Sequence, residues 1–103
     1  MSVLLEFAMF PTDKGASVSS YVSKVIDMVR NSGVSYKLTP MGTVIEAETM
    51  AKALHILEKA YEVLADDAER VYCSAKFDIR KGKSNRMDGK IESIEGKIGK
   101  VQQ

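Results

Sequence analysis

The sequence has very few of the residues on which several large classes of protein function depend. It contains one cysteine, Cys73, and one histidine, His55, so it offers no disulfide within the chain, no Cys-x-x-Cys or clustered-histidine metal site and no iron–sulfur ligand set. It also lacks a Gly-rich phosphate loop, a cleavable signal pattern and any run of about eighteen apolar residues. We therefore expect a soluble, cytoplasmic protein that holds no metal and does not cross a membrane.

An excess of charge of one sign is also missing. The 15 basic and 14 acidic residues leave a net charge of +1, and no long block of either sign occurs. The aromatic motif K/R-G-F/Y-G/A-F-V-x-F/Y, with which RNA-recognition sheets stack bases, is absent as well. These absences argue against nucleic acid as a partner. The 103 residues, 45% of them hydrophobic, instead predict a single domain over residues 1–103 with one core.

The spacing of apolar residues predicts four strands and three helices. Residues 1–10, 34–38, 43–48 and 71–80 are either almost wholly apolar or alternate with a period of two, which is typical of strands. Spacings of three and four predict helices from a Ser17 cap to about Gly33, from a Thr49 cap onwards, and over residues 87–101. The apolar stripe expected for the second helix is Met50, Leu54, Leu57, Tyr61 and Leu64, supported by Ala53, Ile56 and Ala60. Pro40 and Gly42 favour a hairpin turn between the second and third strands.

This order of elements is βαββαβ followed by a C-terminal helix. Two right-handed crossovers convert it into an α+β, ferredoxin-like sandwich, with a four-stranded antiparallel sheet covered on one face by two helices. The other sheet face stays open and is expected to carry Tyr72, Ser74, Lys76 and Asp78 of the last strand. A mixed face of this kind indicates self-association, into a dimer or tetramer, through sheet faces and the C-terminal helix.

Candidate catalytic residues are scarce. His55 lies beside Leu54 in a predicted helix, and no nucleophile can be paired with it, so a place on the helix surface is expected. Cys73 alternates with apolar residues, which is typical of a small buried side chain rather than a nucleophile. The segment from Lys81 to Arg86, KGKSNR, is basic, and a solvated loop is the favoured interpretation over anion binding. These residues do not indicate an enzyme.

Two stretches, GTVIEAE and KFDIRKGKSNR, resemble motifs of the small thiamine-binding proteins when taken together. The first has Gly42, Thr43 and Glu46 in the family's Gly/Ser-x-Thr-x-x-Glu pattern, and the second has the Asp-Ile-Arg ending of the last strand, at Asp78 to Arg80, followed by a glycine. The early segment GASVSSYV, with Ser17, is similar to the family's Ser-x-Ser segment. The resemblance covers essentially the whole chain.

The resemblance implies an oligomer of ferredoxin-like fold that binds thiamine or its hydroxymethylpyrimidine half without catalysis or a cofactor. The candidate ligand-binding residues are Ser17, Thr43, Glu46, Tyr72, Asp78 and Arg80. A carboxylate such as Glu46 could accept the pyrimidine's amino hydrogen, and Asp78 or an aromatic ring such as Tyr72 or Tyr36 could favour the thiazolium cation. We expect Glu46→Gln to weaken ligand binding more than folding.

Three other interpretations stay open. Thr43 and Glu46 could be ordinary strand-surface residues or partners in an interface. The chain could be a structural or regulatory assembly domain without a ligand of its own. It could also be a small enzyme acting on a pyrimidine precursor, for which only Glu46 or Asp78 could serve as an acid or base shifted by burial.

Overall fold

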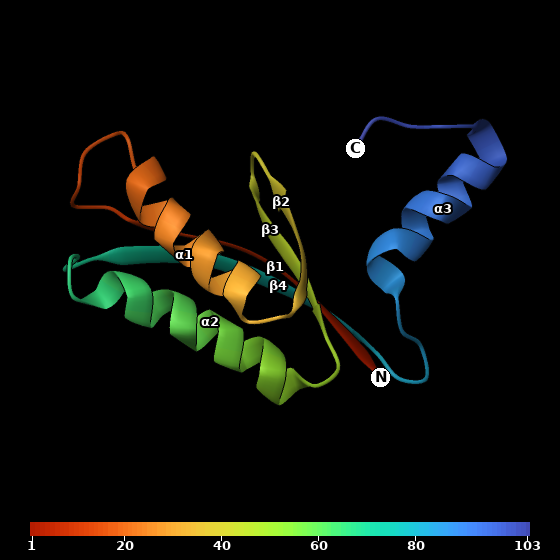
Figure 1. The fold of residues 1–103 in the computed structure, drawn as a ribbon, viewed down its shortest axis with the longest axis horizontal. Helices are drawn as coiled ribbons and strands as arrows, with labels where there is room; N and C mark the ends of the chain where they lie inside the picture. Colours follow the sequence, from red (N-terminus) through yellow and green to blue (C-terminus); the bar gives the residue numbers. More distant parts are fainter.

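The computed structural model describes all 103 residues and has the order of elements predicted from the sequence (Figure 1). The elements are β1 (Ser2–Pro11), α1 (Ser19–Asn31), β2 (Ser35–Thr39), β3 (Gly42–Ala47), α2 (Met50–Ala65), β4 (Val71–Arg80) and α3 (Arg86–Ile98). The strands form one antiparallel sheet in the order β2-β3-β1-β4, and α1 and α2 cover one of its faces. The fold is therefore α+β and ferredoxin-like, as predicted.

The core lies between the sheet and the two covering helices. Because side chains alternate along a strand, β1 directs its odd-numbered residues from Val3 to Met9 to the helices, and β3 does the same with Thr43, Ile45 and Ala47. The buried apolar cluster is Val3, Leu5, Phe7, Met9, Val25, Val29, Ile45, Ala47, Ala53, Ile56, Ala60 and Leu64. Most of it comes from β1 and α2, so these two elements form the centre of the fold.

The buried face of α2 consists of Leu64 and the three residues that were predicted only to support the apolar stripe. The buried residues are Ala53, Ile56, Ala60 and Leu64, whereas Leu54 and Tyr61 are about half exposed. Alanines at two of these four buried positions allow the helix backbone to approach β1 closely. The larger residues of the predicted stripe consequently lie at the margin of the interface, towards β4.

The two predicted helix caps have different outcomes. Thr49 caps α2 as predicted, because its hydroxyl accepts a hydrogen bond from the Lys52 amide at 3.0 Å. The prediction that Ser17 caps α1 is wrong: the helix begins two residues later, at Ser19, and the residue at its N-cap, Val18, makes no side-chain cap bond. Ser17 instead lies exposed in the preceding loop.

The strand β4 forms an exposed edge of the sheet. Its pairing with β1 places Tyr72, Ser74, Lys76 and Asp78 on the open face, as expected. On the other face of the sheet, α2 covers β4 less fully than it covers β1. Cys73 lies on this face of β4 and is exposed. The prediction of a buried Cys73 is therefore wrong, because alternation identifies the face of a strand but not whether a helix reaches over it.

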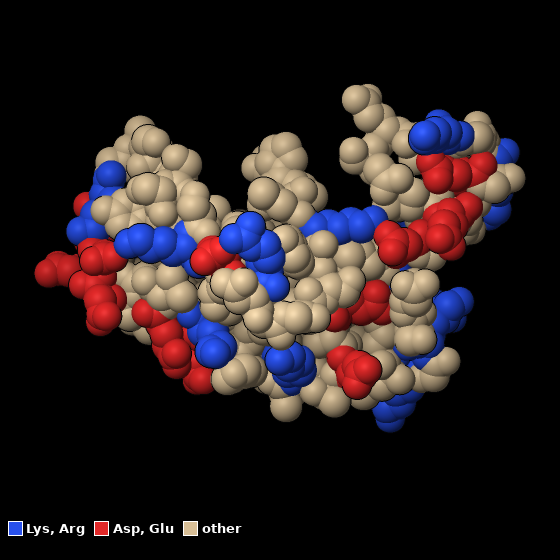
Figure 2. Space-filling view, in the orientation of Figure 1, with Lys and Arg blue, Asp and Glu red and all other residues tan.

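The last helix lies apart from the two-layer body, at the end of the molecule that carries the N-terminus (Figure 1). It ends at Ile98, earlier than predicted, where Gly99 adopts the positive φ of 88° that favours glycine. It has no buried residue. Basic and acidic side chains are interspersed over the side of the molecule shown in Figure 2, α3 included. None of the helices is both long and apolar enough to span a bilayer.

Candidate functional site

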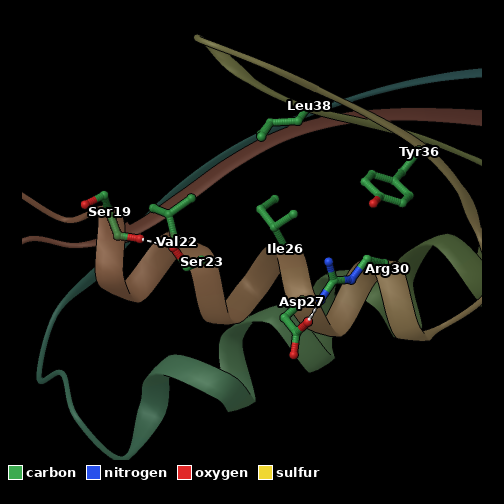
Figure 3. Close-up of a pocket in the computed structure, with 8 residues that line it drawn as sticks. All are labelled: Ser19, Val22, Ser23, Ile26, Asp27, Arg30, Tyr36 and Leu38. Carbon is green, nitrogen blue, oxygen red and sulfur yellow. Dashed lines mark hydrogen bonds and ion pairs between the residues drawn. The ribbon is translucent and has the colours of Figure 1, made fainter.

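A groove runs between α1 and the edge strand β2, and we call it the α1 groove (Figure 3). Its volume is about 580 Å³, and its lining residues are Ser19, Val22, Ser23, Ile26, Asp27, Arg30, Tyr36 and Leu38. The α1 residues recur every three or four positions and so share one side of the helix. Val22 and Ile26 point from this side towards Leu38 and Tyr36 of β2 (Figure 3). The groove therefore has apolar walls with a half-buried aromatic ring at one end.

The polar groups of the α1 groove lie along its rim. Asp27 forms an ion pair with Arg30 one turn further on, and both side chains are more than half exposed. The Ser23 hydroxyl donates a hydrogen bond to the Ser19 carbonyl at 2.6 Å. A carboxylate, a guanidinium, two hydroxyls and a phenol around an apolar slot can orient a small, flat, polar molecule.

A second, smaller hollow continues the α1 groove towards the turn between β2 and β3. The two share Val22, Ile26 and Leu38, and the hollow, of about 270 Å³, extends to Thr43. Thr43 is only 4% exposed and faces the helices. Beside it, a Cβ on Gly42 would lie 3.0 Å from the Phe7 carbonyl oxygen, so glycine permits the close approach of β3 to β1 here.

Glu46 lies on the opposite face of the sheet from Thr43, because three residues along a strand reverse the direction of the side chain. Its two carboxylate oxygens accept hydrogen bonds from the Arg86 amide at 2.9 Å, the Met87 amide at 3.0 Å and the Ser2 hydroxyl at 2.6 Å. Arg86 and Met87 are the first two residues of α3. Glu46 therefore caps α3 from a neighbouring strand, satisfying two amides that have no partner within the helix.

The Arg86 side chain completes this attachment, which we call the α3 anchor and define as Ser2, Glu46, Asp78 and Arg86. Its guanidinium donates to the Ser2 hydroxyl at 3.1 Å, the Ser2 carbonyl at 2.8 Å and the Asp78 carbonyl at 2.6 Å. It also pairs with the Asp78 carboxylate at 3.1 Å, and only 9% of the Arg86 side chain is exposed. Residues of β1, β3 and β4 are thus held together at the start of α3.

The anchor determines the ionisation of Glu46. Burial alone would raise the pKa of this carboxyl, but the hydrogen bonds from Ser2, Arg86 and Met87, together with the positive charge of Arg86, outweigh burial and lower the pKa below its ordinary value of 4.5. Glu46 is therefore ionised at neutral pH, in the form that accepts all three hydrogen bonds.

The six residues predicted as ligand contacts are distributed over both faces of the sheet. Glu46, Asp78 and Arg80 lie together on the open face near α3. Tyr72 is also on that face but at the far end of β4, where its ring packs on Phe10 with centroids 5.6 Å apart. Thr43 lies across the sheet, and Ser17 lies in the loop before α1. No single small molecule can contact all six within one chain.

Sequence reasoning did not identify two groups of residues that shape these sites. Asp27 and Arg30 line the α1 groove, and the signal that could have found them is the spacing of Ser19, Ser23 and Asp27 along one side of α1. Ser2 and Arg86 belong to the α3 anchor, and their hydrogen bond joins residues 84 positions apart. No local sequence pattern predicts the contact between Ser2 and Arg86. No group of three or more histidine, cysteine or acidic side chains is arranged to hold a metal ion.

Comparison with known sequences identifies relatives along most of the chain. A family model described as "Thiamine-binding protein" matches residues 5–95. The UPF0045 protein MJ1052 of Methanocaldococcus jannaschii is 35% identical over 92 residues, which cover 89% of this chain and 91% of that protein. The UPF0045 protein Mb1933 of Mycobacterium bovis is 36% identical over 95 residues, covering 92% and 93%.

Comparison with solved structures gives the same fold. The crystal structure of MJ1052 has a TM-score of 0.81 at 34% identity and covers 90% of this chain and 95% of its own. A Thermotoga maritima protein with a suggested role in thiamine biosynthesis or salvage has a TM-score of 0.78, covering 91% of this chain and 99% of its own. At 16% identity, the latter similarity shows the fold alone.

Proposed function

Because the chain belongs to the thiamine-binding protein family, we propose that it binds thiamine or the hydroxymethylpyrimidine half of thiamine, without catalysing a reaction on the ligand. The family match gives a thiamine-related role, and the α1 groove supports a binding site within this chain. The observation that carries the proposal is the combination in that groove of an apolar slot, an aromatic ring and a carboxylate.

The chemistry of the α1 groove suits both rings of thiamine. A flat pyrimidine can pack between Ile26 and the Tyr36 ring, and an aromatic face also favours the thiazolium cation. The Asp27 carboxylate can accept a hydrogen bond from the pyrimidine amino group or lie beside the cation. Its ion pair with Arg30 is well exposed, so exchanging it for a ligand contact costs little.

The adjoining hollow extends the proposal to Thr43. A ligand in the α1 groove can reach it past Val22 and Leu38, which line both spaces. Thr43 is therefore the residue of the predicted set that we retain as a contact of the same ligand. Glu46, Asp78 and Arg80 are on the other side of the sheet, and Glu46 already receives three hydrogen bonds.

We also propose that the protein works in the cytoplasm as a dimer or tetramer. The open sheet face carries Phe10 and Tyr72 away from α3, and α3 exposes Ile98 at its C-terminal end. A second copy that packs against both would bury an apolar surface that one chain leaves in water.

The test is calorimetric titration of the protein with thiamine and with hydroxymethylpyrimidine. We expect Asp27→Asn to raise the Kd for thiamine about tenfold or more, because it removes a charge-assisted contact. Asp66→Asn, at the C-cap of α2 and outside the residues that line the groove, is the matched control and should leave the Kd unchanged. Tyr36→Leu should weaken both ligands, with Tyr61→Leu as its control.

Each result has a distinct meaning. Equal affinity in Asp27→Asn and Asp66→Asn would remove the α1 groove as the site. No binding of either ligand by the unmodified protein would overturn the proposed function. It would favour an assembly domain without a ligand, an alternative supported by a third helix that has no buried residue.

A further inference from the structure

A second groove lies on the open face of the sheet, and we call it the basic groove. Its floor comes from β1 and β4, one wall from α3, and one end from the loop between β4 and α3. Its volume is about 480 Å³, and its lining residues are Leu4, Asp78, Arg80, Lys83, Asn85, Arg86, Gly89, Lys90, Ser93 and Ile94. The α3 residues among them follow helical spacing, so they form one continuous side of that helix.

The charges in this groove are strongly unbalanced. Four cations, Arg80, Lys83, Arg86 and Lys90, line the groove with one carboxylate, Asp78. The ionised Glu46 of the α3 anchor adds a second negative charge beside Arg86, which leaves a surplus of two positive charges. The whole chain carries a net charge of only +1. The basic groove is therefore a local concentration of positive charge in a chain that is otherwise nearly neutral.

Three of the four cations have no partner within the chain. Of the structure's five ion pairs, the only one in this groove joins Arg86 to Asp78. Arg80, Lys83 and Lys90 take part in none of them. Like charges held together on the walls of one groove repel one another, and an anion between them would relieve that repulsion.

The groove also has a fixed frame and uncharged donors. The α3 anchor holds Arg86 with four contacts, so the wall formed by the start of α3 is held against the floor. The Asn85 side chain makes no cap bond to the helix that follows it, so its amide is free to donate into the groove. Ser93 adds a hydroxyl about one helical turn beyond Gly89, on the same side of α3.

We propose that the basic groove is a binding site for a phosphate group. Phosphate is compact, carries between one and two negative charges near neutral pH, and offers several acceptor oxygens to a ring of cationic and neutral donors. Three unpaired cations match that charge better than the single charge of a carboxylate. The site is on the opposite face of the sheet from the α1 groove, so it does not depend on the proposed binding of thiamine.

The phosphate group could be free inorganic phosphate or the phosphate of an organic ester. Leu4 and Ile94 give the groove an apolar margin against which an organic group could pack. A nucleic-acid backbone is disfavoured, because the chain as a whole carries a net charge of only +1 and no long block of basic residues.

The experiment titrates isotope-labelled full-length protein with inorganic phosphate and, separately, with phenyl phosphate, in about 0.15 M salt to screen unspecific attraction. Amide chemical shifts report the site. We expect both probes to shift the amides of residues 80–94. In Lys83→Gln/Lys90→Gln, both apparent Kd values should rise about tenfold, because two charge-assisted contacts are lost.

The matched control is Lys52→Gln/Lys59→Gln, which removes the same charge from exposed positions on α2. It should change the Kd by less than about twofold. Tighter binding of phenyl phosphate would assign the groove to esters, and tighter binding of inorganic phosphate would assign it to the free ion. Equal weakening in both double variants, or shifts that chloride reproduces at the same ionic strength, would overturn the proposal. All affected positions are exposed, and thermal melts confirm that each variant is folded.

Discussion

Glu46 shows how one carboxylate can be given two different roles by sequence and by structure. Its resemblance to a ligand-contacting position predicts a binding role, which stays a prediction. The structure adds three hydrogen bonds that attach α3 to the sheet. Glutamine at this position would keep one acceptor oxygen, but its side-chain NH2 group would face a backbone N–H, and two donors cannot form a hydrogen bond with each other. The variant should therefore affect α3 directly.

We predict that Glu46→Gln lowers the free energy of unfolding by about 1–2 kcal/mol at neutral pH and speeds hydrogen exchange in α3. Denaturant titration and amide exchange measure these effects. Glu48→Gln, two residues away and exposed, is the control and should change stability by less than about 0.5 kcal/mol. Unchanged exchange in α3 would show that the anchor does not hold the helix in solution.

The same residue predicts a pH dependence. Because the pKa of Glu46 is lowered in the folded protein, its contribution is fully present above pH 4.5, the ordinary value, and is lost as pH falls through the lower folded-state pKa. The difference in stability between the unmodified protein and Glu46→Gln should shrink over that range. A difference that stays constant down to pH 3, about 1.5 units below the ordinary value, would contradict the assignment.

Single residues also mark the limit of prediction from sequence. The period of two in β3 implies that Thr43 and Glu46 face opposite sides, and this follows from the sequence alone once the strand is recognised. The contact of Ser2 with Arg86 does not follow, because nothing local specifies which strand end a distant helix will meet. The family resemblance predicted that Thr43 and Glu46 contact the same ligand, because they are three residues apart in one motif. In the structure their side chains lie on opposite faces of the sheet.

At the scale of secondary structure, the helices were easier to find than to orient. The strong apolar spacing of α2 predicted its length and its Thr49 cap correctly. Its rotation was predicted less well, because the larger Leu54 and Tyr61 were given the centre of the stripe, whereas Ala53 and Ala60, predicted only to support it, are the buried residues. In α1 a serine two residues before the helix was mistaken for the cap, since serines occupy four of the positions from 17 to 23.

The two caps provide a paired test. Thr49→Ala should lower stability by about 1 kcal/mol, because the Lys52 amide loses its acceptor. Ser17→Ala should change stability by less than about 0.5 kcal/mol, because Ser17 caps nothing in the structure. Thermal or denaturant unfolding of the two variants decides the matter. A larger cost for Ser17→Ala would mean that α1 begins earlier in solution than in the structure.

At the scale of the whole molecule, the sequence predicted the ferredoxin-like layout correctly because the order of strands and helices leaves few ways to pair them. It could not predict where α3 would lie. The helix contacts β1 and β3 but none of its residues is fully buried, and the pattern of its isoleucines predicts burial without saying against what.

We predict that the unmodified protein sediments as a dimer or tetramer at micromolar concentration. Ile98→Glu, at a position 74% exposed in the single chain, should shift the distribution towards the monomer. His55→Glu, on the surface of α2, is the control. A monomer at all concentrations would remove the proposed assembly, and a shift caused equally by both variants would place the contact elsewhere.

The α3 anchor also has a consequence for the order in which the chain folds. It joins one residue from each of β1, β3 and β4 to the start of the last helix, and the bonded residues are 84, 40 and 8 positions apart. The acceptors for Arg86 are correctly spaced only after those three strands have paired in register. The docking of α3 must therefore be a late event, which occurs on a finished sheet and so reports that the rest of the chain has reached its native arrangement.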